Sequence, residues 1–254
     1  MLYICRWFKS KREILNFMPN VQMTTTENFE DFIINDDFRN HLEMIKNKGV
    51  IITDPPYNQS YKYDNYHDKL PEDKYIELLS CIPKPCIIIH YPEQSINYLS
   101  KALGNCDECI AWIYNHQYKQ FRLVTFFGIK PNFELVRKPV ENPDDVRWKH
   151  DGTTRSNDWI KIPQVKNTSE EKTGLERGKD GHPCQIPARL SEFIINLLNP
   201  DEIINNTIID PFMGSGSILK QAKINNYNVK GFEISPKYFE IAKKNIAQYQ
   251  LKLL

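Results

Sequence analysis

Long apolar runs are missing from this 254-residue sequence. A membrane-spanning helix needs about 18 or more consecutive apolar residues, and no segment of the sequence offers them. The opening segment contains Arg6, Lys9, Lys11 and Arg12, and its apolar stretch is too short and interrupted for a signal peptide. We therefore expect a cytoplasmic protein with no membrane partner.

An excess of charge of either sign is also missing. Lys and Arg number 33 against 32 Asp and Glu, which gives a formal net charge of +1, so the molecule as a whole has no electrostatic bias toward nucleic acid. Any basic surface that contacts DNA has to be local. The apolar fraction of 41% and the charged fraction of 26% are typical of soluble globular proteins, and a chain of this length can bury one large core.

Cysteines are few, six in all, which is too sparse for the disulfide framework of a small secreted domain. Free thiols are therefore expected. Cys81, Cys86, Cys106 and Cys109 together offer four thiolates to a zinc ion. Cys86, however, opens the apolar run 86–91 and is interpreted as a buried strand residue. We therefore expect no metal.

Short apolar runs rich in β-branched residues alternate with segments of helical periodicity. The runs predict strands at 49–53, 86–91, 109–115, 207–210 and 228–233. The periodic segments predict helices at 71–82, 95–103, 187–198, 217–225 and 235–249. This alternation predicts an α/β fold with a doubly wound, mostly parallel sheet. From about 130 to 181 prolines and polar residues break the rhythm, so this segment is predicted to be an insertion outside the sheet.

The sequence Asp54-Pro55-Pro56-Tyr57 directly follows the strand predicted at 49–53, and open α/β sheets bind ligands at the carboxyl ends of their strands. The prolines fix φ and remove backbone donors, which leaves the Pro55 carbonyl as an acceptor beside the Asp54 carboxylate. Two such acceptors can hold both N–H groups of an exocyclic amine on a base and aim its nitrogen at an electrophile. Tyr57 offers a flat face on which an extruded base can stack. A proline-terminated strand without a chemical role is the alternative.

A glycine turn, residues 210–217, follows the strand predicted at 207–210. Gly214 and Gly216 allow a ligand to approach the backbone closely, and the helix that follows attracts an anion at its N-terminus. A third glycine at dinucleotide spacing is missing, so a methionine carboxylate suits the turn better than a pyrophosphate. Glu233 ends the next predicted strand, where an acid can accept the two hydroxyls of a ribose.

These motifs resemble the permuted β class of DNA amino-methyltransferases, the N6-adenine/N4-cytosine family, over roughly residues 21–249. The resemblance implies an S-adenosylmethionine-dependent methyltransferase fold that is circularly permuted, with the Asp54 motif first and the glycine turn last. It implies a basic extension at 1–20, the catalytic half of the core at 21–130, a target-recognition insertion at 131–181 and the cofactor-binding half at 182–254.

The resemblance also assigns roles to residues. Asp54, Pro55, Pro56 and Tyr57 resemble the catalytic motif. The segment 33–38 and the segment 182–187 resemble parts of the cofactor site, with Asp36 where glycine is usual and Ile186 where lysine is usual. The implied cofactor-binding residues are Asp37, Asp54, His182, Pro183, Gln185, Asp210, Phe212, Gly214, Gly216, Ser217 and Glu233.

The insertion falls where this family keeps its target-recognition segment, and it carries cations between tryptophans. Cations suit phosphates, and neighbouring polar side chains suit base edges. A solvated polar loop is the alternative. The implied DNA-binding residues are Arg147, Lys149, Arg155, Lys161 and Lys166.

The implied reaction is transfer of a methyl group to N6 of an adenine flipped out of double-stranded DNA. N4-cytosine methylation on the same scaffold is the alternative, although that group more often carries Ser-Pro-Pro-Tyr. A protein-glutamine methyltransferase is disfavoured by Asp54 and by the motif order. A second alternative is a catalytically inactive nucleic-acid-binding subunit, which the departure at Ile186 keeps open. The recognition sequence, a cognate restriction enzyme and a homodimer all stay open.

Overall fold

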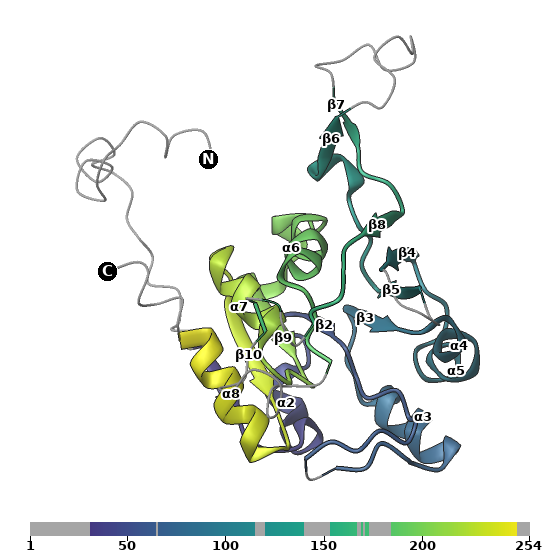
Figure 1. Cartoon of the computed structure of the whole chain (residues 1–254), viewed down its shortest axis with the longest axis vertical. Coiled ribbons are helices and arrows are strands. Elements are labelled where there is room, and N and C mark those ends of the chain that lie inside the picture. Colours follow the sequence, from purple (N-terminus) through teal and green to yellow (C-terminus); the bar gives the residue numbers. More distant parts are fainter. Residues whose placement is uncertain are drawn as a thin grey trace, which may run out of the picture. The chain divides into compact units, whose positions relative to one another are not determined.

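The structure is a computed structural model that describes residues 31–64, 66–114, 120–139, 153–166, 169, 171–172 and 184–247. Within these residues, eight strands form one sheet in the order β1-β10-β9-β2-β3-β5-β4-β8. A separate two-stranded ribbon, β6 with β7, lies beyond β8 (Figure 1).

One half of the large sheet is parallel and the other is mixed. The parallel half comprises β1 (Phe32–Ile34), β10 (Asn228–Phe232), β9 (Thr207–Asp210), β2 (Val50–Thr53) and β3 (Cys86–His90). In the mixed half, β5 (Phe121–Phe127) is antiparallel to β3 and to β4 (Glu108–Ile113), and β4 runs parallel to β8 (Trp159–Lys161). The ribbon pairs β6 (Arg137–Pro139) antiparallel with β7 (Thr153–Arg155). Every residue of β2 and β3 is buried, as expected for parallel strands covered on both faces.

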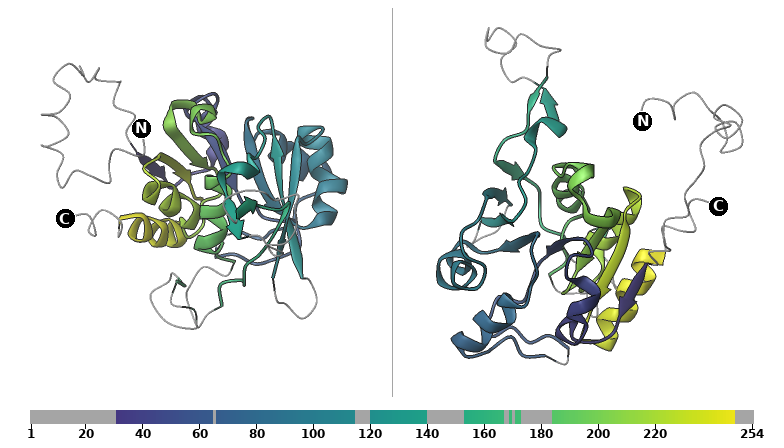
Figure 2. Two further views of the ribbon diagram at one scale, coloured as in Figure 1. Left: turned by 90° about the horizontal axis from the view of Figure 1, so that it is seen from above. Right: turned by 180° about the vertical axis from the view of Figure 1, so that it is seen from behind.

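Helices cover both faces of the sheet (Figure 2). One face packs against α6 (Ala188–Asn196), α7 (Ser217–Ile224) and α8 (Pro236–Ala247). The other packs against α2 (Leu42–Ile45), α3 (Glu72–Ser80) and α5 (Ser100–Leu103), with short turns of helix at Phe38–His41, α4 (Pro92–Gln94) and Ser95–Leu99. In β2, Val50 and Ile52 join the first core and Ile51 the second, so the sheet is doubly wound, as predicted.

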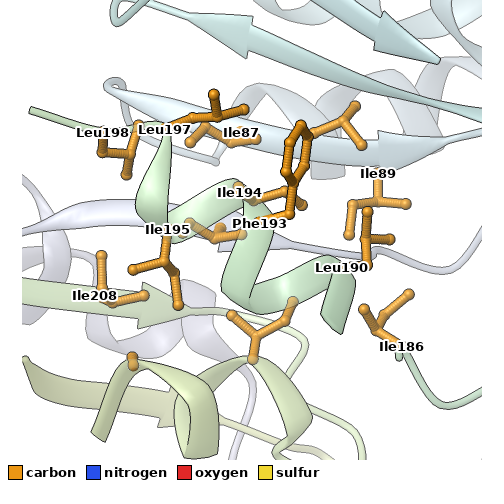
Figure 3. Packing of buried hydrophobic residues seen from close by; sticks show 14 of the residues in the cluster. Ile87, Ile89, Ile186, Leu190, Phe193, Ile194, Ile195, Leu197, Leu198 and Ile208 are labelled. Carbon is orange, nitrogen blue, oxygen red and sulfur yellow. The ribbon is translucent and has the colours of Figure 1, made fainter. Parts of the chain in front are cut away.

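Helix α6 lies in the middle of the first core. Its Leu190 and Ile194 are fully buried, and they pack near Ile89 of β3 and Ile208 of β9 (Figure 3). The apolar positions of α6 recur every three or four residues, which gives the helix one apolar stripe. Ile186 joins the same cluster (Figure 3). Ile186, for which the resemblance implied a lysine, is therefore a core residue.

The predicted strands and helices are present, with small shifts at their ends, and the predicted α/β fold with a doubly wound, mostly parallel sheet is confirmed. The sequence patterns predict neither β1, which has three half-buried residues, nor β5, because no segment of helical periodicity marks it off from the preceding strand and Arg122 interrupts its apolar run. The expectation that residues 131–181 stay outside the sheet is wrong at β8, which extends the sheet beside β4. This strand alternates exposed residues with the half-buried Ile160, so it lacks the apolar run by which the other strands are recognised. In the described part of the chain, no helix is long and apolar enough to span a membrane.

We predict that Ile194→Ala lowers the free energy of unfolding by about 2–5 kcal/mol, because the side chain is fully buried in the first core. Equilibrium urea unfolding followed by circular dichroism measures the change. The control is Ile96→Ala, the same substitution at a residue that is 76% exposed. There the free energy of unfolding is expected to change by no more than about 0.5 kcal/mol. Equal losses at the two positions would contradict this assignment of the core.

Candidate active site

Three neighbouring parallel strands end at one cavity. β2 is followed by Asp54, β9 by Pro211 and β10 by Glu233, and all three residues line a cavity of about 720 Å³. This is the carboxyl edge of the sheet, where open α/β proteins bind ligands, and the volume is usual for a small-molecule site. Phe212 and Gly214 of the glycine turn line the same cavity. Asp54 and the glycine turn therefore share one site, although they lie far apart in the sequence.

A buried hydrogen bond joins β2 to β9 beneath the cavity. Thr53 Oγ1 donates to Asp210 Oδ1 at 2.6 Å, and the same oxygen accepts from the Phe212 backbone N–H at 3.1 Å. Burial raises the pKa of Asp210 to about 7, and the two hydrogen bonds oppose this rise. Asp210 is 1% exposed and lies under the cavity wall rather than in it, so its task is to hold the start of the turn.

Glu233 supports the glycine turn from β10. Its Oε2 accepts from the Gly214 N–H at 3.0 Å and its Oε1 from the Ser235 N–H at 2.9 Å. Burial raises the pKa of Glu233, while these N–H groups lower it. Each carboxylate oxygen has a further lone pair, so Glu233 can still accept hydrogen bonds from hydroxyl groups of a ligand.

Asp37 adds a further carboxylate to the cavity lining. It caps the short helix Phe38–His41, and its Oδ1 accepts from the Arg39 N–H at 2.9 Å. Burial acts to raise the pKa of Asp37, but hydrogen bonds and charge from Arg39 outweigh it, so the pKa lies below its usual value.

Asp54 is a nearly buried carboxylate with one partner for each oxygen. The Tyr57 hydroxyl donates to Oδ1, and Arg122 Nη1 lies 3.7 Å from Oδ2. Burial raises the pKa of Asp54 to about 6, while the charge of Arg122 and the Tyr57 hydroxyl oppose the rise. Near neutral pH most of the carboxylate is therefore ionised, with lone pairs left to accept from a ligand.

Aromatic rings form the wall beside Asp54. The ring centroids of Tyr57 and Tyr91 lie 5.0 Å apart at an interplanar angle of 64°. The Tyr75 hydroxyl donates to the Pro56 carbonyl at 2.7 Å, which fixes the peptide segment that follows Pro55. The loop between β2 and α3 adds further rings to the lining, those of Tyr61, Tyr63 and Tyr66. Such a lining suits planar, ring-shaped ligands.

Gly216 and Ser217 are buried at the start of α7 and stand behind the cavity lining. Gly216 has a φ of +72°, and a Cβ atom there would lie 3.1 Å from Ile246 and 3.2 Å from Ala242. Glycine is required at this position by the backbone and by the packing of α8. The structure assigns neither residue a place in the lining.

The segment before α6 is described only in part. Cys184 lines the cavity. Gln185 is buried, and its Nε2 donates to the Glu171 carbonyl at 2.6 Å. The cofactor-binding predictions at His182 and Pro183 lie outside the described residues.

The predicted DNA-contacting residues that the structure describes are not among those that line the cavity. Arg155 is on β7 of the ribbon, Lys161 is on the edge strand β8 and Lys166 follows it, and all three are exposed (Figure 1). Other predicted positions lie outside the described residues: Arg147, Lys149 and the basic extension at 1–20. The exposed cations are accessible to a large partner, and their role in DNA binding stays a prediction.

Two residues of this site, Arg122 and Tyr91, belong to none of the sequence motifs and were not predicted. Tyr91 directly follows β3, and Arg122 is the second residue of β5. A signal for Arg122 is present, because it is a single charged residue within an apolar run, and buried arginines are seldom unpaired. The sequence does not tell which residue it faces, since Asp54 lies on a distant segment.

Within the described residues, no group of three or more His, Cys, Asp or Glu side chains is placed to hold a metal ion. Cys86, one of the four thiols considered for zinc, is buried at the start of β3, and burial raises the pKa of its thiol to about 12. Cys106 is exposed.

Residues 80–244 match the DNA methylase family of N6/N4 methyltransferases. The match covers more than half of the sequence. The chain belongs to the N6/N4 DNA methylase family. The matched stretch of this methylase includes Arg122, the glycine turn and Glu233, and it begins after the Asp54 motif.

The methylase is similar to several type II methyltransferases. It is 26% identical over 226 residues to M.HpaI of Haemophilus parainfluenzae. That alignment covers 78% of this chain and 67% of M.HpaI. It is 35% identical over 96 residues to the orphan methyltransferase M.BamHII of Bacillus amyloliquefaciens. This alignment covers 37% of this chain and 33% of M.BamHII.

Two solved structures share the fold of this methylase. The M1.HpyAVI–SAM complex has a TM-score of 0.54 at 19% identity and covers 84% of this chain and 98% of its own. The cytosine-N4-specific PvuII DNA methyltransferase has a TM-score of 0.56 at 15% identity, with 84% and 85% covered.

We predict that Thr53→Val lowers the free energy of unfolding by about 1–3 kcal/mol at alkaline pH, because a buried acceptor loses its donor. The loss should shrink as the pH falls through about 7, the pKa of Asp210, because the protonated carboxyl no longer needs that donor. Urea unfolding at several pH values measures both effects.

The control is Thr207→Val, the same change at a buried threonine whose hydroxyl donates to the Asn205 carbonyl at 2.9 Å. A carbonyl does not titrate, so the stability lost in Thr207→Val should be independent of pH. A pH-independent loss for Thr53→Val as well would show that Asp210 is not the partner that matters.

Proposed function

We propose that this methylase transfers the methyl group of S-adenosylmethionine to N6 of an adenine flipped out of double-stranded DNA, in one direct step. The observation that carries the proposal is the single cavity shared by Asp54, the glycine turn and Glu233. A base amine and a nucleoside-type cofactor both have suitable partners within that cavity, so one site can hold the two reactants together.

The residues of the cavity fit S-adenosylmethionine by their chemistry. Glu233 and Asp37 are acceptors for ribose hydroxyls, and Phe212 gives an apolar surface beside them. We assign direct contacts with S-adenosylmethionine to these three residues and to Gly214, whose backbone lines the cavity. Asp210, Gly216 and Ser217 belong to the same assignment as buried supports of the turn. When bound, the cofactor supplies an electrophilic methyl group on a sulfonium, and the sulfur keeps the electron pair of the broken C–S bond.

Asp54 and Pro55 position the base amine. The Asp54 carboxylate accepts one N–H of the amine and the Pro55 carbonyl accepts the other, which directs the nitrogen lone pair at the methyl carbon. Tyr57 stacks on the flipped ring, as aromatic residues do with extruded bases. After the methyl group has moved, the nitrogen carries an extra proton, and Asp54, which holds the amine, can accept it. Holding the reactants in this geometry is worth about 7–11 kcal/mol of the barrier.

The insertion and the basic extension are proposed to hold the DNA. Arg155, Lys161 and Lys166 are exposed on the ribbon, on β8 and after it, and exposed cations of this kind bind phosphates. Arg147 and Lys149 complete the proposed set. This division gives the target-recognition segment the bounds 131–181 and leaves the two halves of a permuted core on either side.

N4-cytosine methylation is the second candidate. The similarity of the fold to a cytosine-N4-specific methyltransferase favours it, since the same acceptors fit either amine. Asp54 as the first motif residue favours adenine. An inactive DNA-binding subunit is the third candidate, and the ionised Asp54 beside an open cavity disfavours it.

We predict that cells expressing the parental chain acquire N6-methyladenine in one sequence context, and that Asp54→Ala abolishes this mark. In vitro, transfer from labelled S-adenosylmethionine should fall by about 10²–10⁴-fold, because the amine loses the acceptor that orients it. Modification-detecting sequencing and radiolabel transfer measure the two results. The control is Asp201→Ala, at an exposed aspartate far from the motif, which should keep the parental activity.

Each outcome of this experiment selects among the candidates. N4-methylcytosine in place of methyladenine supports the second candidate. No mark with the parental chain supports the third. Parental labelling by folded Asp54→Ala protein refutes the site assignment.

We predict that methyl transfer declines as the pH drops through about 6. Asp54 has a pKa of about 6 and accepts the amine only when ionised, so the rate should be constant above this pH and fall below it. Initial rates measured from about pH 5 to 9 at constant ionic strength test this. Binding of S-adenosylmethionine, measured over the same range, should not show the same midpoint. A rate that stays flat down to about pH 5 contradicts the role of Asp54.

A further inference from the structure

We infer that Arg122 is a positioning residue of the methylation site: an aromatic cage fixes its guanidinium, which in turn holds the Asp54 carboxylate in place for the base amine. The inference rests on the proposed function, because that function gives Asp54 its task. The observation behind it is a separate one, the surroundings of Arg122 on β5.

Arg122 is a buried cation beside a nearly buried anion. The residue is 5% exposed and lies on β5 directly opposite Trp112 of β4. Its Nη1 lies 3.7 Å from Asp54 Oδ2. Removing two charges from water is unfavourable unless they are paired, and even a buried pair adds little to stability. A pair of this kind at the wall of a ligand cavity therefore indicates a role in binding or chemistry.

Four aromatic rings surround the guanidinium. Its Cζ lies 5.2 Å from the ring centroid of Tyr57, 5.0 Å from that of Tyr91, 5.3 Å from that of Trp112 and 5.9 Å from that of Tyr114. Cations are attracted to aromatic rings within about 6 Å, more strongly when water is excluded. Tyr57 lies in the loop after β2 and Tyr91 directly follows β3. Trp112 is in β4, and Tyr114 directly follows that strand. They therefore hold the guanidinium from several sides.

Hydrogen bonds do little to fix Arg122. Its Nη2 donates to the Tyr91 hydroxyl at 3.5 Å. In the described part of the chain, its Nε is buried without a hydrogen-bond partner. A guanidinium carries five N–H donors in one plane. With so few of them used, the rings and the charge of Asp54 determine where the group lies.

Asp54 is thereby held at both oxygens. Tyr57 donates to Oδ1, and Arg122 faces Oδ2, so rotation of the carboxylate would break one of the two interactions. Tyr57 also belongs to the cage, which links the stacking platform for the base to the acceptor of its amine. A displacement of Arg122 would disturb both.

The charge of Arg122 has a second effect, on the ionisation of Asp54. The groups that interact electrostatically with Asp54 come from several elements: Tyr57, Tyr63, Tyr75, Arg122, Cys184 and Asp210. Among these, Arg122 is the cation, and it lowers the pKa of Asp54 against the effect of burial. Removing it should raise that pKa and move the loss of activity to higher pH.

The test compares Arg122→Met, Arg122→Lys and the control Arg189→Met in the full chain, with Arg189 being exposed on α6. We expect Arg122→Met to lower kcat by about 100-fold or more and to shift the acid limb of the pH–rate profile to higher pH. The affinity for S-adenosylmethionine should stay within about twofold of the parental value, a difference of less than about 0.5 kcal/mol. Arg122→Lys should return the acid limb toward its parental position because it restores the charge. Its kcat should stay reduced, because an ammonium does not fill the cage as a planar guanidinium does. Arg189→Met should match the parental chain.

The readouts separate this inference from the proposed function. A parental chain that is active, with Arg122→Met keeping the parental kcat or the parental acid limb, overturns the role of Arg122 alone. A parental chain that methylates no DNA refutes the proposed function, and this inference with it. Melting temperatures report whether the variants fold. If Arg122→Met does not fold, Arg122→Lys decides: a reduced kcat with an unmoved acid limb supports the inference, and a parental kcat overturns it.

Discussion

The parallel pairing of β2 with β9 is the constraint on which the site depends. Ile51 lies beside Ile209 in this pair, and the Thr53–Asp210 hydrogen bond closes it at the carboxyl end. Adjacent parallel strands end at the same edge of a sheet, so the residues after them meet in space. A shift by one residue would turn the side chains of β2 to the opposite faces. The pairing therefore decides both that Asp54 meets the glycine turn and that its carboxylate lines the cavity.

The third strand, β10, completes this edge because α7 packs very closely on it. A Cβ atom at Gly231 would lie 2.5 Å from a Leu219 side-chain atom and 2.6 Å from the Met213 sulfur, so a larger residue would force these side chains to move. The close packing brings the turn within hydrogen-bonding distance of Glu233. Packing in the core thus determines the shape of the cavity beside the glycine turn.

Burial, rather than net charge, gives the site its electrostatic character. The protein is nearly neutral overall, with a formal charge of +1, yet burial raises the pKa of Asp54 to about 6 and that of Asp210 to about 7. Asp210 accepts from the Thr53 hydroxyl of the neighbouring strand, and Asp54 accepts from the Tyr57 hydroxyl and faces the Arg122 guanidinium. Burial also explains Ile186, whose apolar side chain belongs to the core that contains α6. The departure from the family's lysine is therefore a change in packing.

The sequence by itself determined four strands of the parallel half, β2, β3, β9 and β10, together with the helices that follow them and the motifs after β2 and β9. Buried parallel strands are continuous apolar runs, and proline and glycine constrain the backbone locally, so short segments carry these signals. The tertiary structure alone decided that β1, β5 and β8 join the sheet. It also decided that Phe212, Gly214 and Glu233 line the cavity while Asp210 and Gly216 lie beneath it. It alone placed Arg122 against Asp54. Such contacts join residues from distant segments, and they follow from how strands pair and pack, which no local pattern records.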